Sequence, residues 1–232
     1  MREKDALNVY LMRHGETDWN KDRRCQGKSD IPLNDYGRKL AKITKKAMEE
    51  EGISFDFCYA SPLVRAYETA QIVLEGMDVT PVTDERLKEI SFGDCEGLAI
   101  PMMRQNPSKY AAFLKCFTDP ENYVPMGDGE TFTDLTGRLS DFVGEKILPL
   151  EGQYENVLVA CHGAVVRGMI CVMRNIPIRD FWDSIQMNCA VSCLSLENGK
   201  FDIIYEGRIF YEAEHEYLDP STGKMIRDGK RH

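Results

Sequence analysis

The stretch of sequence that decides the fold is Asn8-Val9-Tyr10-Leu11-Met12-Arg13-His14-Gly15. Residues 9–12 form a short apolar run, which is typical of a buried strand, and the run ends at the charged Arg13. Much later, residues 156–161 form a second apolar run, which leads into His162 and Gly163. Such continuous apolar character suits the middle of a parallel sheet, where both faces are covered. The sequence therefore predicts two buried strands, each followed by histidine and glycine.

Helix and strand patterns alternate along the rest of the chain. The clearest helix pattern covers residues 132–147, where apolar side chains recur on one face. Further helices are expected over 34–51, 63–75, 108–117 and 163–174. Further strands are expected over 55–60, within 79–87, and over 190–196 and 200–205. The last two strands flank a hairpin signal. A polar loop up to Leu33 and a tail after Tyr211 are expected to lack regular structure. The alternation predicts an α/β fold, a three-layer α/β/α sandwich with a mostly parallel central sheet.

Composition limits the kinds of protein that this chain can be. Hydrophobic residues make up 43% and charged residues 29%, which excludes a disordered, collagen-like or coiled-coil protein. The length of 232 residues predicts one domain over 1–232, with an irregular stretch at 98–130 and a polar tail at 212–232. The 29 basic and 38 acidic residues give a net charge of −9, which argues against nucleic acid or an anionic membrane as a partner.

The chain is expected to work in the cytoplasm. The sequence shows no apolar run of the ~7–15 residues of a secretion signal or the ~20 of a spanning helix. Its eight cysteines include no Cys-x-x-Cys pair and lie scattered through apolar segments. We therefore expect reduced thiols in the core rather than a disulfide framework.

Three sequence features follow expected strands: Arg13-His14-Gly15, Ser61-Pro62 with Arg65, and His162-Gly163. Ligands of open α/β sheets gather at the carboxyl ends of strands. The guanidinium of arginine is always charged and presents a planar fork that matches phosphate oxygens. Two arginines and two histidines that converge at one sheet edge would form a pocket for a dianion such as a phosphoryl group.

A competing motif shares one of these segments. Cys161 and Arg167 are separated by five residues between a strand and a helix, which is the spacing of a cysteine-phosphatase loop. The intervening residues argue against that loop, because Val165 and Val166 are β-branched and only one glycine is present to cradle a phosphate. We interpret Cys161 as a buried strand residue. His14 and His162 lack nearby carboxylates at ligand spacing, so no metal site and no cofactor are expected.

The motifs as an ordered set resemble the histidine phosphatase superfamily, which includes the cofactor-dependent phosphoglycerate mutases. The resemblance covers about residues 6–206 and rests on residues 11–20, on Arg24-Cys25-Gln26-Gly27, on residues 61–70 and 87–97, on Gly129-Glu130-Thr131, and on Cys161-His162-Gly163 through Arg167. It implies a phosphoglycerate mutase-like fold. Two positions depart from the usual pattern: Cys25 stands where an aromatic residue is common, and Cys95 where tryptophan is common.

The resemblance also implies roles for individual residues. His14 is expected as the nucleophile that forms a phosphohistidine, and Glu89 as the proton donor that later activates water. The transferred phosphoryl group is expected to bind Arg13, Arg65 and His162, with His162 counted among the catalytic residues. The further residues expected to contact the substrate or line the pocket are Asn20, Thr17, Gln26 and Gly27. Since Glu89 must begin protonated, activity should be highest on the acidic side of neutral pH.

The sequence favours a metal-independent phosphomonoesterase that acts on a small phosphorylated metabolite. Residues 98–130 contain three basic residues, Arg104, Lys109 and Lys115, beside several acidic ones, which is not a strong site for a second phosphate. Two alternatives remain: a 2,3-bisphosphoglycerate-dependent phosphoglycerate mutase, and a phosphate-binding regulatory protein without turnover. The aromatic residues Tyr110, Phe113, Phe117 and Tyr123 are interpreted either as an apolar substrate wall or as core packing.

Overall fold

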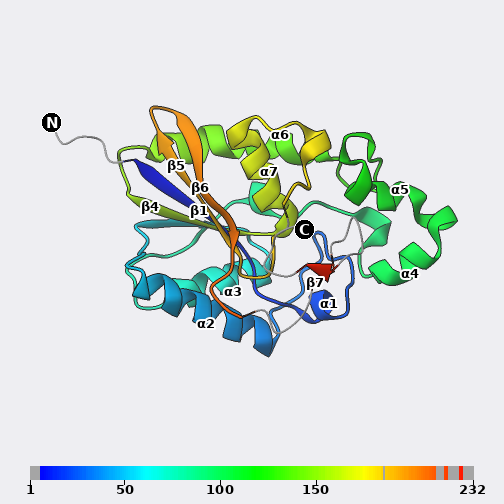
Figure 1. Cartoon of the computed structure of the whole chain (residues 1–232), viewed down its shortest axis with the longest axis horizontal. Helices are drawn as coiled ribbons and strands as arrows, with labels where there is room; N and C mark the ends of the chain where they lie inside the picture. Colours follow the sequence, from blue (N-terminus) through cyan, green and yellow to red (C-terminus); the bar gives the residue numbers. More distant parts are fainter. Residues whose placement is uncertain (1–5, 185, 213–216, 219–224, 227–232) are drawn as a thin grey trace.

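A six-stranded sheet with the order β3-β2-β4-β1-β5-β6 forms the centre of the molecule (Figure 1). The computed structural model describes residues 6–184, 186–212, 217–218 and 225–226. The strands are β1 (Leu7–Arg13), β2 (Phe57–Ala60), β3 (Val82–Thr83), β4 (Asn156–Cys161), β5 (Val191–Glu197) and β6 (Lys200–Arg208). The first four run parallel to one another, whereas β5 and β6 are antiparallel additions beside β1. The predicted mostly parallel sheet is confirmed.

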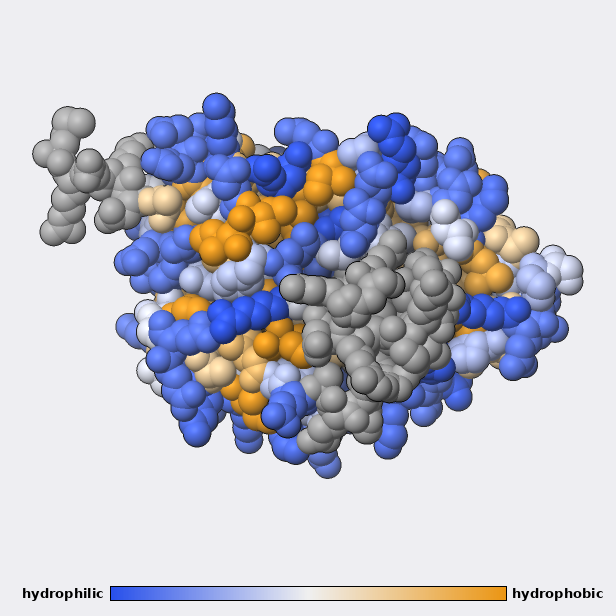
Figure 2. All heavy atoms as spheres, viewed as in Figure 1, coloured by the Kyte–Doolittle hydropathy of each residue, from blue (hydrophilic) through white to orange (hydrophobic). Residues whose placement is uncertain are grey.

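Helices cover both faces of the sheet, so the predicted three-layer sandwich is also confirmed. In Figure 1, α2 (Asp35–Glu50) and α3 (Val64–Val73) lie on one side of the sheet, and α6 (Phe132–Phe142) and α7 (Gly163–Arg174) on the other. Two further helices, α4 (Ile100–Gln105) and α5 (Pro107–Thr118), lie beyond one end of the sheet. Figure 2 shows the molecule in the view of Figure 1, with hydrophilic side chains over much of the visible surface and smaller apolar patches between them.

The alternation of side chains along the central strands explains why two helix layers are needed. Val9 and Leu11 of β1 belong to the apolar core under α6 and α7, while Tyr10 and Met12 belong to the core under α2 and α3. Successive residues of a strand point to opposite faces, so a strand that is apolar throughout must be covered twice. This is the pattern that the apolar runs of the sequence indicated.

Most of the expected elements are present with small shifts at their ends. Asn34 caps α2, since its side-chain oxygen accepts a hydrogen bond from the Gly37 amide at 2.8 Å. The helix expected over 132–147 is α6 followed by a wider π-helical turn from Val143 to Ile147. The hairpin of β5 and β6 turns at Asn198 and Gly199, whose φ angles of 53° and 73° are those of a two-residue hairpin turn.

Three expectations of irregular structure were wrong. A four-residue helix, α1 (Asp18–Lys21), lies within the stretch predicted as a loop, where Thr17 and Asn20 form a capping box. The irregular stretch 98–130 contains α4 as well as the expected α5. The stretch after Tyr211, predicted to have no structure, contains the short strands β7 (Tyr217–Leu218) and β8 (Met225–Ile226), which pair antiparallel. Residues 213–216, 219–224 and 227–232 of the predicted 212–232 tail lie outside the described residues.

Among the residues that the structure describes, no helix is both long enough and apolar enough to cross a membrane. Each of the eight cysteines is described, and each is buried and unpaired.

Candidate active site

The parallel pairing of the central strands brings the predicted strand-end residues together. Arg13 at the end of β1 lies in register with Cys161 at the end of β4, and Ala60 at the end of β2 lies in register with Ala160. The residues that follow these strands therefore start from one sheet edge. The rings of His14 and His162 lie 5.2 Å apart between centroids.

The hydrogen bonds of His14 determine which ring nitrogen carries the proton. Its Nδ1 lies 2.6 Å from the Gly15 carbonyl oxygen, which only accepts, so Nδ1 is the protonated nitrogen. Nε2 then keeps its lone pair and accepts a hydrogen bond from Nε of Arg65 at 3.2 Å. Burial, followed by the charges of Arg65 and Arg13, lowers the pKa of His14 well below its ordinary value. The imidazole is therefore neutral near pH 7, with its free lone pair on Nε2.

Arg65 is fully buried and is held by two backbone carbonyls. Its Nη1 donates to the Ser29 carbonyl at 2.7 Å, and its Nη2 donates to the Gly27 carbonyl at 2.8 Å. Burial lowers the pKa of Arg65 to about 10, which still leaves the guanidinium charged at neutral pH. Gly27 has a φ of 53°, and a Cβ at this position would lie 1.9 Å from Oε1 of Glu96. Both features favour glycine at this position.

Two more predicted residues hold buried nitrogens without a hydrogen-bond partner. Nη1 of Arg13 donates to the Gln186 carbonyl at 2.6 Å, but its Nε has no partner. Nε2 of His162 pairs with Oγ of Ser61 at 2.8 Å, and its Nδ1 has no partner. A buried polar atom without a partner is costly. Nε of Arg13 always carries a proton, and Nδ1 of His162 carries one when its Nε2 accepts from the Ser61 hydroxyl, so both nitrogens are suited to donate to oxygens of a bound phosphoryl group.

Burial also lowers the pKa of His162 well below its ordinary value, and the nearby charge of Arg65 acts in the same direction. His162 is therefore a neutral hydrogen-bonding residue behind His14. It is completely buried, and the cavity described below is lined by its neighbours Gly163 and Ala164.

Glu89 lies at the start of α7, although it comes from a distant loop. Its Oε1 accepts a hydrogen bond from its neighbour Ile90 at 3.0 Å, and its Oε2 accepts one from the Ala164 amide at 3.3 Å. Withdrawal from water raises the pKa of Glu89, although these amides and Arg65 oppose the rise. A carboxyl group with a raised pKa is suited to carry a proton and release it.

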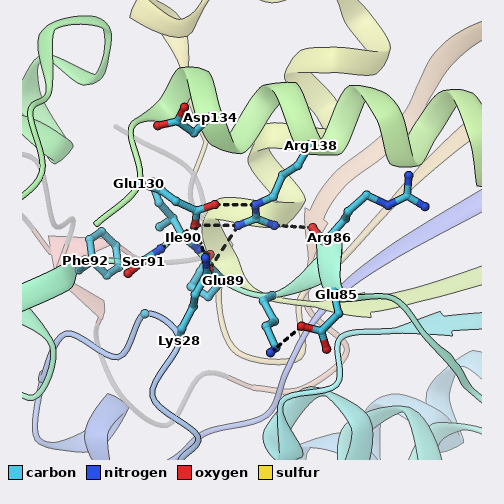
Figure 3. A network of polar contacts seen from close by, with 12 residues as sticks. Lys28, Glu85, Arg86, Glu89, Ile90, Ser91, Phe92, Glu130, Asp134 and Arg138 are labelled. Atoms are coloured by element: carbon cyan, nitrogen blue, oxygen red, sulfur yellow. Dashed lines mark hydrogen bonds and ion pairs between the residues drawn. The ribbon is translucent and has the colours of Figure 1, made fainter. Parts of the chain in front are cut away.

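An ion pair that the sequence analysis did not assign holds the loop of Glu89 (Figure 3). Nε of Arg138 donates to Oε1 of Glu130 at 2.9 Å, and Oε2 of Glu130 accepts from the Ser91 amide at 2.9 Å. Arg138 also donates to the backbone carbonyls of Arg86 and, at 3.3 Å, of Glu89. Burial acts to raise the pKa of Glu130, but the hydrogen bond and charge of Arg138, together with the Ser91 amide and Lys28, outweigh burial and lower the pKa.

A second unassigned carboxylate, that of Glu96, organises the loop that holds Arg65. Its Oε1 accepts from the Lys28 amide at 2.9 Å, and its Oε2 accepts from the Ser29 amide at 2.9 Å and from Oγ of Ser29 at 2.5 Å. These bonds fix the backbone that presents the Gly27 and Ser29 carbonyls. Glu96 lay within a quoted motif, but no local pattern showed what it contacts.

The site opens into a cavity of about 170 Å³. The polar residues that line it include six of the predicted site residues, namely Arg13, His14, Asn20, Gln26, Arg65 and Glu89, and Gly27 lines it as well. Thr17 lies further back, where its Oγ1 donates to Oε1 of Gln26 at 3.0 Å. Asn188, which the sequence analysis did not single out, donates from Nδ2 to the His14 carbonyl at 3.1 Å.

The aromatic residues of the 98–130 stretch divide into two groups. Phe117 lines the cavity, whereas Tyr110, Phe113 and Tyr123 are buried in the core. The interpretation as core packing is confirmed for Tyr110, Phe113 and Tyr123, while Phe117 is placed where it could form part of a substrate wall.

The cysteine-phosphatase loop is not formed. Cys161 is fully buried in β4, and burial raises the pKa of its thiol. Nε of Arg167 donates to the Phe181 carbonyl at 2.7 Å, and its Nη1 pairs with Glu206. Within the described part of the chain, no group of three or more histidine, cysteine or acidic side chains is placed to hold a metal ion.

Comparisons with known proteins show the family of this chain. Residues 9–206 match the model of the histidine phosphatase superfamily, branch 1. The chain is 35% identical over 164 residues to the uncharacterized phosphatase PhoE of Bacillus subtilis, covering 70% of this chain and 75% of that protein. It is 31% identical over 188 residues to a 2,3-bisphosphoglycerate-dependent phosphoglycerate mutase of Methylobacterium, covering 77% and 88% of the two chains.

Among solved structures, YhfR of Bacillus stearothermophilus superposes with a TM-score of 0.78 at 34% identity, covering 87% of this chain and 97% of that one. The matched relatives thus include both phosphatases and mutases. The fold, the ordered motifs and the match over residues 9–206 lead to one conclusion: this chain belongs to the histidine phosphatase superfamily.

Proposed function

We propose that this chain is a metal-independent phosphomonoesterase that hydrolyses a small phosphorylated metabolite through a phosphohistidine at His14. The observation that carries the proposal is the pair of hydrogen bonds of His14. Nδ1 is bound to the Gly15 carbonyl at 2.6 Å, which leaves Nε2 unprotonated beside Arg65. A neutral, fixed imidazole beside a buried cation is what attack on a phosphoryl dianion needs.

In the first step, the lone pair of Nε2 forms a bond to phosphorus while the bond from phosphorus to the ester oxygen breaks. Glu89 gives its proton to that oxygen, so an alcohol leaves and Glu89 becomes a carboxylate. Hydrogen bonds from Arg13, Arg65 and His162 stabilise the charge on the phosphoryl oxygens. The Gly15 carbonyl accepts from Nδ1 and stabilises the positive charge that the ring gains.

In the second step, the Glu89 carboxylate takes a proton from water, whose oxygen attacks phosphorus. The bond between phosphorus and Nε2 breaks, which releases inorganic phosphate and restores neutral His14. Asn20, Gln26 and Gly27 border the cavity and are proposed substrate contacts, while Thr17 supports Gln26.

Mutase activity is the second candidate, and the 31% identity to a phosphoglycerate mutase favours it. A mutase must hold a second anionic group and keep water from the phosphohistidine. The balance of basic and acidic residues in the segment 98–130 does not provide a strong second anion site and supports the hydrolase instead. Assays with and without 2,3-bisphosphoglycerate separate the two activities: a phosphatase releases free phosphate, whereas a mutase forms the isomerised phosphoester.

We also propose that residues 1–232 act as one cytoplasmic domain in which the segment 98–130 covers the substrate. Ile100 and Phe117 of this segment line the cavity, which supports the covering role. The eight unpaired cysteines support a reducing compartment. The proposed partner is the small phosphorylated substrate. We do not propose nucleic acid or a membrane as a partner.

Steady-state phosphate release tests the proposed function. The wild-type chain should hydrolyse p-nitrophenyl phosphate in the presence of EDTA, and His14→Ala should abolish turnover. Cys161→Ala should retain it, because Cys161 lies outside the cavity. Turnover by His14→Ala and none by Cys161→Ala would restore the cysteine mechanism. Tight phosphate binding without any turnover would favour the regulatory alternative.

A further inference from the structure

Part of the cavity wall is apolar, and it comes from segments outside the proposed phosphate-binding residues. Phe92 follows the loop of Glu89, Ile100 begins α4, and Phe117 lies near the end of α5. Trp182 lies shortly after the 3-10 turn Ile178–Asp180. The centroids of the Phe117 and Trp182 rings are 6.3 Å apart. Segments distant in the sequence thus supply one aromatic surface to the cavity.

The two rings are held in place by contacts on their other sides. Nε1 of Trp182 donates to the Cys116 carbonyl at 2.6 Å, and its ring packs on Phe181 at 4.8 Å between centroids. Phe117 packs edge-on against the buried Phe113 at 5.6 Å between centroids. Since the one hydrogen-bond donor of Trp182 is already used, the indole offers carbon surface to the cavity. Both side chains are only partly buried, so this surface remains accessible.

The charged groups of the cavity do not provide a second strong anion site. Among the described residues that line it, the cations are Arg13, Arg24 and Arg65. Arg13 and Arg65 are already assigned to the transferred phosphoryl group, and each nitrogen of Arg65 has one partner in His14 or a backbone carbonyl. Arg24 is solvent-exposed, donates to the Gly97 carbonyl at 3.0 Å, and lies 3.6 Å from the Asp22 carboxylate. A carboxylate on the leaving group would lose hydration here without a dedicated partner.

We infer that the natural substrate is a phosphomonoester whose alcohol carries a flat apolar ring, and that this ring packs against Phe117 and Trp182. The inference rests on the proposed phosphatase function and specifies the substrate class. Packing of a ring on aromatic side chains removes apolar surface from water and adds the preference of rings for offset or edge-on contact. A phosphorylated glycerate or amino acid has no ring, so it gains neither the burial of apolar ring surface nor the ring-to-ring contact.

A set of phosphate esters with similarly basic leaving alcohols tests the inference, because their chemical steps are comparable. We expect kcat/KM for 2-phenylethyl phosphate to exceed that for ethyl phosphate by ~10–200-fold, the range that apolar pocket contacts provide. Butyl phosphate should fall between them. O-Phosphoserine and 3-phosphoglycerate should not exceed ethyl phosphate. Equal values for butyl and 2-phenylethyl phosphate would overturn the requirement for a ring, and a preference for 3-phosphoglycerate would overturn the inference altogether.

Variants locate the preference on the two rings. Phe117→Leu and Trp182→Leu should each lower the ratio of kcat/KM for 2-phenylethyl phosphate to kcat/KM for ethyl phosphate by ~10-fold, within the range for a changed apolar pocket. Val124→Ala is the matched control, since Val124 belongs to the same 98–130 segment and is 67% exposed. An unchanged ratio in both ring variants would place the ring elsewhere and contradict the inference.

A binding measurement on the wild-type chain separates failure of the inference from failure of the proposed function. Benzylphosphonate and ethylphosphonate cannot be hydrolysed at phosphorus, so their affinities do not depend on turnover. We expect benzylphosphonate to bind more tightly than ethylphosphonate by ~10-fold or more. Equal affinities, with normal hydrolysis of ethyl phosphate, would overturn the substrate class and leave the phosphatase function standing. Absence of hydrolysis of every ester would overturn both.

Discussion

Nε of Arg65 lies 3.2 Å from Nε2 of His14, and both side chains are almost completely buried. The contact joins a permanent cation to the nitrogen that keeps its lone pair. It favours the neutral imidazole, because a protonated ring would place two positive charges side by side in a site of low polarity. It also holds the guanidinium next to the proposed position of the phosphoryl group.

Removal of the Arg65 charge should therefore affect both rate and pH dependence. Arg65→Met should reduce kcat/KM by ~100–1,000-fold, the cost of losing one donor to a transition-state oxyanion. Burial and Arg65 together lower the pKa of His14, so loss of Arg65 lets this pKa rise. The acidic limb of the pH–rate profile should then move to higher pH.

Arg167→Met is the matched control for Arg65→Met, because Arg167 is also fully buried but pairs with Glu206 outside the cavity. It should leave the acidic limb in place even if the fold is destabilised. An acidic limb that stays at the same pH in Arg65→Met would contradict the proposed coupling.

Glu89 should show its role through the leaving group. Its raised pKa keeps a protonated fraction to higher pH, and the lowered pKa of His14 keeps the imidazole neutral to lower pH. Activity requires both forms, so the optimum should lie on the acidic side of neutral. Glu89→Gln should reduce kcat/KM by ~10²–10⁴-fold for alkyl phosphates, the usual contribution of a general acid. The loss should be much smaller for p-nitrophenyl phosphate, whose leaving group needs no proton. Equal losses for both substrates would argue against proton donation.

The ion pair of Arg138 and Glu130 should act through the position of Glu89. Arg138→Met removes donors to the carbonyls of Arg86 and Glu89. Like Glu89→Gln, it should lower kcat/KM more for alkyl phosphates than for p-nitrophenyl phosphate, but by a smaller factor. We expect a loss of ~10-fold for alkyl phosphates, as for a modest misplacement of a catalytic group, with little change for p-nitrophenyl phosphate. Arg208→Met, which removes an exposed pair with Glu51, serves as the control. A loss that is the same for all leaving groups would indicate a merely structural role.

Gly27 should be sensitive to a single methyl group. Gly27→Ala introduces strain at a φ of 53° and places Cβ 1.9 Å from Oε1 of Glu96. Gly52→Ala is a matched control, because Gly52 has a φ of 75° and no neighbouring atom within 4 Å of the added Cβ. In urea titrations, Gly52→Ala should lower the free energy of unfolding by about 1 kcal/mol. Gly27→Ala should lower it by a further ~1–3 kcal/mol from overpacking. Equal losses of unfolding free energy in the two variants would show that the loop and Glu96 move apart without cost when the methyl group is added.

The sequence indicated the site residues that follow buried strands, and for a simple reason. The carboxyl ends of parallel strands meet at one edge, so His14, His162 and Arg65 were expected to converge before any distance was known. The residues that hold them had no such signal. Asn188 contacts the carbonyl of His14 across 174 positions of the chain, and Arg138 contacts that of Glu89 across 49.

Local irregularity explains the other differences. The capping residues Thr17 and Asn20 were visible, but four residues are too few to show a helical period. In α5, Tyr110 has non-helical angles (φ −112°, ψ 17°), which interrupt the regular face on which a pattern would place Phe113 and Phe117. Which of these aromatic residues lines the cavity depends on how α5 packs against distant segments such as that of Trp182, which lies beside Phe117.

Trapping of the covalent intermediate tests the central claim most directly. The chain is mixed with p-nitrophenyl phosphate, quenched in alkali, and analysed by peptide mass spectrometry and phosphorus NMR, since a phosphorus–nitrogen bond survives alkali and is cleaved in acid. The account predicts an acid-labile phosphoryl group on Nε2 of His14, absent from His14→Ala and more abundant in Glu89→Gln. A label on Cys161, or normal turnover by His14→Ala, would contradict it.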